Sequence, residues 1–494
     1  MLTNVLKQIT SKCSVSKLYC VASFGLSTLG NTQPHVCIVG SGPAGFGVAQ
    51  TLLKNHEQVQ VDMFEKLPVP FGLIRYGVSP DHQDVKNAIN GYSQTATSKR
   101  FSFFGNIEIG QDVSLTELLS AYHAVVLCYG AQEEATFNIS GKNLKNVFSS
   151  KQFVGWYNGN PEFQNLDVNL SGKSAVIIGV GNVALDCARM LLKPTEQLQE
   201  TDITSRALKT LQKSNIKNVY VVGRRGPMQM ACTRKELSEV AGLECVNTFV
   251  EENCFSKSVE TALKSKDLAR RKQRRLVAYL QKVSKQVKDD TSEDTKKLYL
   301  KLLRSPVALE SKNDDLIANV KLIKREMQGE DAFNPTFTDT NVVENLPCDI
   351  VVSCIGYQNA VISDDIPFVD GKIMNKNGKV DDRKDLFTCG WCSHGAKGVL
   401  ADSSNDSLVT GASVLSNLDQ LASDKNCNGS NDIVPKILQR GLQITSWKDW
   451  KTIDSFEIKR GQKLGKVREK VVSCDEMLQI ANEGKSNEAN TSEK

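Results

Sequence analysis

The sequence contains no apolar run long enough to cross a lipid bilayer. A membrane-spanning helix needs about 18 consecutive apolar residues, and none of the 494 residues lies in such a run. A strong excess of one charge is also missing, because 61 Lys and Arg face 56 Asp and Glu. We therefore expect no transmembrane segment and no nucleic-acid partner. The apolar fraction of 40% and the charged fraction of 24% are those of a folded globular protein.

Acidic residues are missing from the start of the chain, where the first one is Glu57. The opening segment carries Lys7, Lys12 and Lys17 among many serines and threonines. Such segments are typical of mitochondrial transit peptides, and Lys17 interrupts the apolar core that a secretory signal needs. We predict a transit peptide over residues 1–33 and a mitochondrial location in the matrix, with peripheral association with the inner membrane left open. The alternative is a tail without a targeting role.

Fourteen cysteines are scattered along the chain, most of them inside apolar runs. Cysteine in such a run behaves as a small buried hydrophobe, and we predict no bound metal. One pair, Cys389 and Cys392, has the CxxC spacing of a redox dithiol.

Two segments have the pattern of a strand, a glycine-rich turn and a helix. The first is His35–Val39 with a helical pattern over Phe46–Lys54, and the second is Ser174–Ile178 with one over Leu185–Leu192. Further strand-like runs are Val59–Phe64, Ala124–Cys128, Val219–Val222 and Ile350–Ile355. Apolar strands that alternate with helices predict parallel sheets covered on both faces. The predicted fold class is α/β, with two Rossmann-like dinucleotide-binding domains.

The first turn has the form GxGxxG. Gly40 permits the tight turn, Gly42 lets the backbone approach a pyrophosphate, and Gly45 allows close packing of helix on strand. Glu65 ends the next strand about 20 residues further on, where a carboxylate binds a ribose hydroxyl and repels a 2′-phosphate. The motif predicts a dinucleotide without that phosphate; the alternative is a glycine-rich turn with nothing bound.

The second turn, with Gly179, Gly181 and Ala184, is a GxGxxA variant. The strand Val219–Val222 ends at Gly223 and is followed by Arg224 and Arg225. An NAD site has a carboxylate there, whereas two guanidiniums suit a 2′-phosphate. We therefore predict NADP(H) at this site, the alternative being a solvated strand end. The two sites together indicate a resident FAD and an exchangeable NADPH, with hydride passing from the nicotinamide to the flavin.

At Val69–Val78, with the sequence VPFGLIRYGV, the chain resembles the adrenodoxin reductase family, mitochondrial ferredoxin–NADP reductases that use FAD. The likeness continues at Pro80–His82, Phe153–Gly159, Gly181–Asp186, Gly223–Pro227, Ile355–Tyr357, Gly390-Trp391, Gly398-Val399 and Arg468–Lys470. The resemblance implies that the NADP domain is inserted into an FAD domain built from both chain ends. We expect the FAD domain at 34–133 and 349–494, and the NADP domain at 134–348.

The resemblance also implies which residues contact the cofactors. With the fingerprint glycines, the FAD positions are Gly40, Gly42, Ala44, Gly45, Glu65, Leu73, Ile109, Trp391, Gly398, Val399 and Leu400. The NADP positions are Gly179, Gly181, Asn182, Val183, Arg224, Arg225, Glu236 and again Gly398.

The chemistry that the resemblance implies is acceptance of one hydride and transfer of two single electrons to an acidic, adrenodoxin-like 2Fe–2S ferredoxin. His82 and Asp186 match a buried His–Asp pair near the flavin that is expected to relay protons; the alternative for His82 is a loop histidine without a role. The electrons supply cytochrome monooxygenases in steroid metabolism, iron–sulfur cluster assembly, or both.

A basic run between Lys264 and Lys288 holds ten Lys and Arg and a single acid, Asp267. Its densest part contains Arg270, Arg271, Arg274 and Arg275, and the apolar stripe of a helix is predicted from Leu268, Leu276, Val277 and Leu280. Such a face would steer an acidic ferredoxin into place. The alternative is a solvated surface that the acidic segment 289–294 partly neutralises.

The chain departs from the family pattern at Cys392-Ser393-His394 and at Ala401–Ser404. The first departure creates the CxxC pair and with it a rival, an NADPH-dependent flavin disulfide reductase that uses Cys389 and Cys392. Against this rival, Cys389 closes an apolar strand, whereas reactive thiols need an exposed, electropositive setting. Two further rivals are a protein like the small subunit of glutamate synthase, whose N-terminal cysteine cluster has no counterpart before Gly40, and a nucleotide sensor without turnover.

Overall fold

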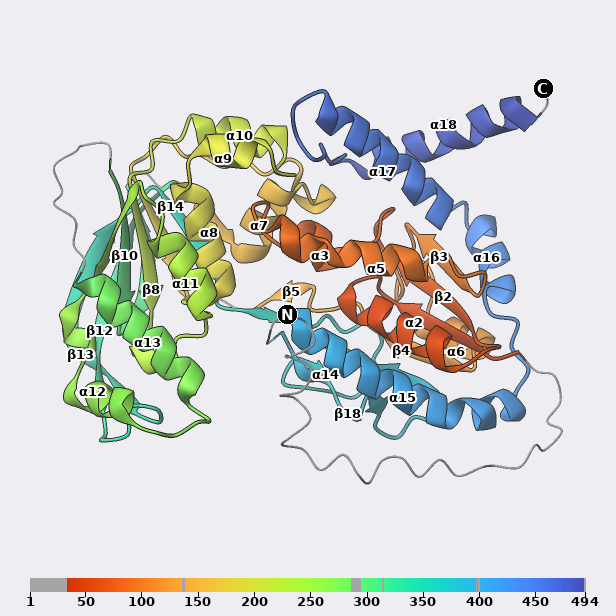
Figure 1. Ribbon diagram of the computed structural model, residues 1–494, viewed down its shortest axis with the longest axis horizontal. Coiled ribbons are helices and arrows are strands. Elements are labelled where there is room, and N and C mark those ends of the chain that lie inside the picture. The colour runs from red at the N-terminus through yellow and green to blue at the C-terminus, as the bar shows by residue number, and fades with distance from the viewer. Residues whose placement is uncertain are drawn as a thin grey trace, which may run out of the picture.

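The apolar strands assemble into two separate sheets, one in each half of the molecule (Figure 1). The computed structural model describes residues 33–135, 138–285, 295–312, 315–396, 398 and 400–492, and for residues 400, 401 and 486–492 the backbone alone. Residues 1–32 of the predicted transit peptide therefore lie outside the described part of the chain. We call the half with the seven-stranded sheet the first lobe and the half with the six-stranded sheet the second lobe.

The seven-stranded sheet takes its strands from both ends of the chain. Its order is β18 (Asn375–Lys376), β19 (Lys379–Val380), β20 (Leu386–Thr388), β4 (Ala124–Leu127), β1 (His35–Val39), β2 (Gln60–Glu65) and β3 (Phe101–Gly105). The strands from β20 to β3 are parallel, and β18 and β19 form an antiparallel edge. The side chains of β1, β2, β4 and β20 are almost fully buried, as the apolar runs predict.

Helices cover both faces of this sheet. One face packs on α2 (Pro43–Asn55) and α15 (Leu400–Asp424), with Phe46 and Leu418 in the shared core. The other face packs on α6 (Leu115–Ala121) and α16 (Ser430–Gln439), with Leu118 and Ile433 in a second core. The first lobe also contains α3 (Gly72–Tyr76), α4 (Gln83–Lys86), α5 (Ala88–Thr95), α14 (Trp391–His394), α17 (Trp447–Gln462) and α18 (Cys474–Ser492).

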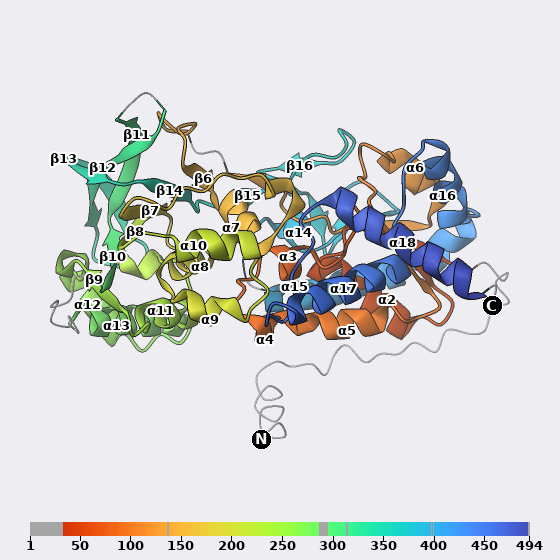
Figure 2. The same ribbon diagram turned by 90° about the horizontal axis from the view of Figure 1, so that it is seen from above.

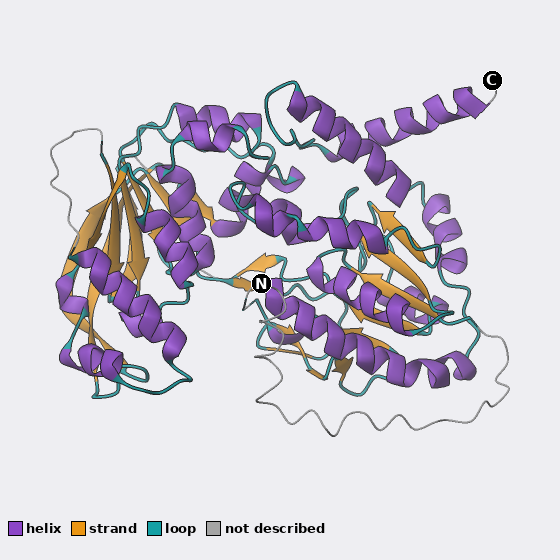
Figure 3. Cartoon of the chain, viewed as in Figure 1, coloured by secondary structure: helices purple, strands orange, loops and turns teal. Residues whose placement is uncertain are grey.

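The six-stranded sheet of the second lobe is parallel throughout. Its order is β6 (Val147–Ser149), β14 (Ile350–Ser353), β7 (Ser174–Ile178), β8 (Asn218–Gly223), β10 (Lys296–Leu302) and β9 (Val246–Val250). One face is covered by helices, and Figure 3 shows them beside the strands. The helices of this lobe are α7 (Ser150–Asn158), α8 (Asn182–Leu192), α9 (Thr195–Gln199), α10 (Ser205–Gln212), α11 (Arg234–Ala241), α12 (Lys257–Lys264) and α13 (Arg271–Ser284).

The other face of this sheet is covered by a second sheet rather than by helices. That sheet is antiparallel, in the order β11 (Arg304–Ser311), β12 (Ile317–Gln328) and β13 (Thr336–Pro347). Its Val320 and Leu322 pack on Val176 and Ile178 of β7. The sequence pattern does not predict this layer.

The chain crosses between the lobes twice, and the two crossings lie side by side. β5 (Glu133–Glu134) on the way out pairs antiparallel with β15 (Tyr357–Gln358) on the way back. The predicted return to the first lobe at residue 349 is too early, because β14 pairs with β6 and β7 and so belongs to the second lobe. A short hairpin of β16 (Phe368–Val369) and β17 (Lys372–Ile373) follows the return crossing.

The predicted α/β fold with two Rossmann-like units, one inserted into the other, is confirmed. Both views place α17 and α18, the last helices of the chain, over the first lobe (Figures 1 and 2). Among the described residues, no helix combines the length and apolar character needed to span a membrane.

Candidate FAD and NADP sites

The turn between β1 and α2 has three glycines with three different surroundings. Gly40 has a φ of +103°, and a Cβ there would lie 2.6 Å from the carbonyl oxygen of Cys128. A Cβ on Gly45 would lie 2.0 Å from the carbonyl oxygen of Gly40. A Cβ on Gly42 would meet nothing within 4 Å. Gly40 and Gly45 are therefore required by packing, and Gly42 leaves its backbone open to a ligand at the start of α2.

Glu65 lies over this turn from the end of β2. Its Oε2 atom accepts hydrogen bonds from the Ser41 backbone N–H at 3.0 Å and from the Ser41 hydroxyl at 2.7 Å. Its Oε1 atom accepts one from the Leu67 backbone N–H at 3.2 Å. The carboxylate is thus fixed beside the open backbone of Gly42, where the ribose of a dinucleotide fits and a 2′-phosphate would be repelled.

The turn between β7 and α8 repeats this arrangement in the second lobe. Gly179 has a φ of +124°, and its Cβ would lie 2.3 Å from the carbonyl oxygen of Cys354 at the end of β14. A Cβ on Gly181 would again meet nothing within 4 Å. Asn182, the first residue of α8, accepts a hydrogen bond from the backbone N–H of Thr233 at 2.8 Å, which brings the start of α11 beside the turn.

Arg224 and Arg225 lie at the carboxyl end of β8, the strand next to β7. Both side chains are exposed, and no salt bridge to a described residue engages either guanidinium. The backbone is held in place because Arg325 donates to the carbonyl oxygen of Arg224 at 3.1 Å. Two uncommitted guanidiniums beside a second open glycine turn fit the 2′-phosphate of NADP(H).

Segments distant in the sequence meet the first turn. A Cβ on Gly390 would lie 2.7 Å from the Cβ of Ala44, so the start of α14 touches the start of α2. The Gly390 backbone N–H donates to Asp406 of α15 at 2.8 Å, and Trp391 stacks on Tyr357 with ring centroids 6.0 Å apart.

The remaining predicted flavin contacts have mixed surroundings. Leu73 on α3 is 43% exposed, whereas Ile109 is buried. Gly398 is exposed with a φ of +90°. Val399 and the side chain of Leu400 lie outside the described part of the chain.

Comparison with known proteins identifies the family to which the chain belongs. Residues 34–242 match the family described as pyridine nucleotide-disulphide oxidoreductase. The chain is 41% identical over 485 residues to the NADPH:adrenodoxin oxidoreductase, mitochondrial, of Salvelinus fontinalis, covering 96% of both chains. It is 42% identical over 457 residues to the Homo sapiens protein of the same name, covering 90% of this chain and 92% of that relative.

The chain belongs to the NADPH:adrenodoxin oxidoreductase family. The solved structure of Mycobacterium tuberculosis FprA in complex with NADPH is similar, with a TM-score of 0.83 and 32% identity over 91% of this chain and 99% of FprA. The protein is accordingly an oxidoreductase, and FAD and NADP(H) are its cofactors. The predicted family, enzyme class and cofactors are confirmed.

His82 has a different partner from the one that its match to this family implies. Its Nε2 atom lies 2.7 Å from Oε2 of Glu239 on α11. This contact joins the two lobes. Asp186 instead accepts a hydrogen bond from Arg189 at 2.7 Å. Burial raises the pKa of Asp186 to about 7, although the charge of Arg189 opposes the shift. No hydrogen bond joins His82 to Asp186, but the two lie close enough for the charge of His82 to lower the pKa of Asp186, so the role of the pair stays a prediction.

Arg189 is a central residue of this region that was not predicted from the sequence. Its buried guanidinium donates to Asp81 at 2.8 and 3.1 Å and to Glu236 at 3.3 Å, in addition to Asp186. Burial favours protonation of Asp81, but the bonds from Arg189 and Lys193 hold the pKa of that carboxyl below its usual range. A signal was present, because an arginine in the apolar pattern of α8 has to be paired when it is buried.

The two CxxC thiols lack the exposed setting of a reactive dithiol, although a hydrogen bond with Cys128 lowers the pKa of Cys389. Cys389 and Cys392 are 1% and 0% exposed, and they pack into cores on opposite faces of the sheet. Burial raises the pKa of Cys392 to about 12, which keeps this thiol protonated. The neighbouring departure His394 forms an ion pair of 3.3 Å with Asp406, and this bond raises the pKa of His394.

Proposed function

We propose that this protein takes a hydride from NADPH and passes electrons singly to an acidic mitochondrial 2Fe–2S ferredoxin of the adrenodoxin kind. The observation that carries the proposal is the pair of opposite charges at matching strand ends, Glu65 in the first lobe and Arg224 with Arg225 in the second. Bound FAD supplies the conversion of one two-electron step into two one-electron steps.

Each part of the two sites has a role in this proposal. The turns at Gly42 and Gly181 present backbone N–H groups at the starts of α2 and α8 to the pyrophosphates of FAD and NADPH. Arg224 and Arg225 select NADPH over NADH by binding the 2′-phosphate. Glu236, which Arg189 holds in the first turn of α11, belongs to the NADP site in this proposal, and His82 with Glu239 forms a contact between the lobes.

The ferredoxin surface that we propose is the amino-terminal part of α13. Arg271 and Arg275 are exposed, are four residues apart on the helix, and form no ion pair with a described residue. Leu276, Val277 and Leu280 are buried beneath them, as predicted, whereas Leu268 precedes the helix and is 74% exposed. The acidic segment 289–294 lies outside the described residues.

Arg270 and Arg274, predicted to dock with the same partner, are engaged within the chain. The guanidinium of Arg270 lies 4.7 Å from the ring centroid of Phe333, and Arg274 donates to the carbonyl oxygen of Asp267. We therefore assign the docking role to Arg271 and Arg275, and Arg270 and Arg274 serve as matched controls.

This assignment predicts a specific loss of ferredoxin reduction. In the double variant Arg271→Gln, Arg275→Gln, kcat/KM for an acidic 2Fe–2S ferredoxin at low salt should fall roughly tenfold or more, because electrostatic steering is lost. The salt dependence should weaken as well, while the rate with ferricyanide, a small acceptor, stays unchanged. Arg270→Gln with Arg274→Gln should have a smaller effect. Equal loss in both double variants, or no loss in either, would contradict the docking role.

The location of the protein and the destination of its electrons are part of the same proposal. The relatives are named as mitochondrial, and we propose that this protein acts in the mitochondrial matrix, with peripheral contact with the inner membrane. There its ferredoxin would supply cytochrome monooxygenases of steroid metabolism, iron–sulfur cluster assembly, or both. The rival disulfide reductase is disfavoured by the burial of Cys389 and Cys392.

A further inference from the structure

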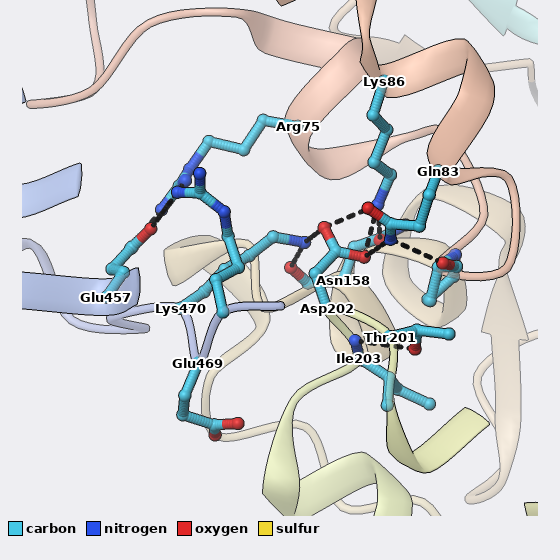
Figure 4. Close-up of polar contacts among 12 residues, drawn as sticks. Arg75, Gln83, Lys86, Asn158, Thr201, Asp202, Ile203, Glu457, Glu469 and Lys470 are labelled. Atoms are coloured by element: carbon cyan, nitrogen blue, oxygen red, sulfur yellow. Dashed lines mark hydrogen bonds and ion pairs between the residues drawn. The ribbon is translucent and has the colours of Figure 1, made fainter. Parts of the chain in front are cut away.

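A buried cluster of charges joins the two lobes away from the glycine turns (Figure 4). Asp202, between α9 and α10 of the second lobe, is only 4% exposed. Lys86 of α4, in the first lobe, donates to both of its carboxylate oxygens at 2.7 Å. Lys470, in the segment between α17 and α18, lies 2.8 Å from the same carboxylate. Gln83 adds a hydrogen bond of 2.9 Å.

The same two lysines reach a second point of the second lobe. Lys470 donates to the carbonyl oxygen of Asn158, the last residue of α7, at 3.0 Å. Lys86 lies 3.5 Å from the side-chain oxygen of Asn158. Lys86 and Lys470 thus each bind two points of the opposite lobe.

The segment around Lys470, residues 466–471, forms hydrogen bonds with both lobes. On the side of the first lobe, the Val471 backbone N–H donates to the buried carboxylate of Glu457 on α17 at 2.9 Å. On the side of the second lobe, the Val467 backbone N–H donates to the carbonyl oxygen of Glu200 at 3.2 Å. The Ser205 backbone N–H donates to the side chain of Glu469 at 2.9 Å.

Stability alone is a poor explanation for this cluster. Two lysines around one aspartate place three ionisable groups in a buried position, and desolvation of such ions costs as much as or more than their attraction returns. Apolar side chains would join two surfaces at a lower cost. The ion pairs instead specify an orientation, because the carboxylate of Asp202 forms all of its bonds in one relative placement of the lobes.

The cluster is connected to the cofactor sites through short rigid elements. α4 follows His82 directly, and His82 contacts Glu239 of the second lobe. α7 runs from Asn158 back to Ser150, whose hydroxyl donates to the hydroxyl of Tyr357 at 2.9 Å. Tyr357 stacks on Trp391, a predicted flavin contact. A rotation of one lobe at Asp202 would therefore move the two glycine turns relative to each other.

We propose that Asp202, held by Lys86 and Lys470, is a positioning residue that fixes the angle between the two nucleotide-binding lobes and so places bound NADPH against the flavin. The inference rests on the proposed hydride transfer between the two sites, and not on the identity of the electron acceptor. Misplacement by about 1 Å is enough to slow a transfer that depends on close approach by up to a hundredfold.

The test compares Asp202→Asn with a matched variant inside one lobe. Asp449 is also a buried aspartate, 5% exposed, with a lysine partner, Lys485, at 3.1 Å, but both lie in the first lobe. Asp449→Asn therefore makes the same chemical change without touching the contact between the lobes. Both holoenzymes are mixed with NADPH in a stopped-flow instrument, and flavin bleaching is followed at several NADPH concentrations.

Amide hydrogen exchange provides the readout that is independent of catalysis. The amides of Val467 and Ser205 report contacts between the lobes, and that of Val471 reports a contact inside the first lobe. In Asp202→Asn, we expect the first two to exchange roughly tenfold faster and Val471 to be unchanged. We also expect hydride transfer to slow by about tenfold or more, with little change in the dissociation constant of NADPH. Asp449→Asn should show neither effect.

Two results would overturn the inference. One is faster exchange at Val467 and Ser205 with an unchanged rate of hydride transfer, because the cluster would then be structural only. The other is unchanged exchange and rate in Asp202→Asn. If that variant does not fold, Lys470→Met, which keeps the Lys86–Asp202 pair, is measured in the same way. Failure of the wild-type protein to reduce a ferredoxin would contradict the proposed function, but these two readouts would still decide the role of Asp202.

Discussion

At the end of β8, Arg224 and Arg225 stand where an NAD-specific site would have a carboxylate. Changing both to glutamine should raise KM for NADPH by about 100-fold or more, because each charge-assisted bond to the 2′-phosphate contributes roughly 1.5–3 kcal/mol. KM for NADH should change little, since NADH lacks that phosphate. Steady-state kinetics with both nucleotides checks this, and an equal loss with NADPH and NADH would show that the arginines do not read the phosphate.

Lys470 is a single side chain with a predictable effect on stability. Burial lowers its pKa from 10.5 to about 7; Asp202 opposes the shift, whereas Lys86 and Arg75 add to it. Between pH 7 and 10.5 the unfolded chain binds more protons at this position, so the cost of burying the charge is full below pH 7 and is relieved as the pH rises.

The resulting prediction concerns the difference between the wild-type protein and Lys470→Met. The free energy of unfolding of the wild-type protein should increase relative to that of the variant as the pH is raised from 7 to 10. Denaturant unfolding at a series of pH values measures this difference. A difference that is flat or falls over this range would show that Lys470 titrates normally in the folded protein.

At the scale of the elements, the two glycine turns can be tested by a matched pair of substitutions. Gly181→Ala adds a methyl group in open space at a φ of −107°, so it should leave stability and flavin content unchanged and weaken NADPH binding by about tenfold or more. Gly179→Ala places its methyl group against the Cys354 carbonyl at a φ of +124° and should destabilise the fold by roughly 1–3 kcal/mol. Nucleotide titration and thermal unfolding separate the two effects, and normal NADPH binding by Gly181→Ala would be evidence against the assigned site.

The parallel strands and their turns were predictable from the sequence because they combine short apolar runs with glycines of fixed spacing. The runs beginning at His35, Ser174 and Ile350 are all buried strands, as expected. The antiparallel layer β11–β13 was not predictable, because its strands are long and many of their side chains are exposed. The position of β14 was missed for another reason: an apolar run indicates a strand but does not indicate which sheet it joins.

The contacts with the cofactors stay predictions, but the positions of the site residues were predictable where a local motif of fixed spacing sets them, as at Gly42, Gly181 and the arginine pair. They were not predictable where a side chain has several partners on different elements. His82 pairs with Glu239, 157 positions away, and no local pattern relates the two. Arg270 and Arg274 are in the same run as Arg271 and Arg275, and only the fold shows that the first two are engaged locally.

At the scale of the whole molecule, two similar nucleotide-binding units carry side chains of opposite charge at matching strand ends, Glu65 in the first lobe and Arg224 with Arg225 in the second. Two neighbouring crossings connect the lobes, and the ion pairs of Asp202 with Lys86 and Lys470 join them at a further point. In the function that we propose, NADPH enters and leaves the second lobe while the flavin remains in the first. The proposed function then requires a fixed stoichiometry, since one hydride carries two electrons and each 2Fe–2S ferredoxin accepts one.

The most direct test of the proposed electron transfer is an anaerobic titration of the yellow holoenzyme with NADPH in the presence of excess oxidised 2Fe–2S ferredoxin. We expect each NADPH to reduce two ferredoxins, as followed by their visible absorbance, and the same concentration of NADH to react far more slowly. A protein that is colourless, that reduces no ferredoxin after its flavin is bleached, or that uses NADH as well as NADPH would contradict this expectation.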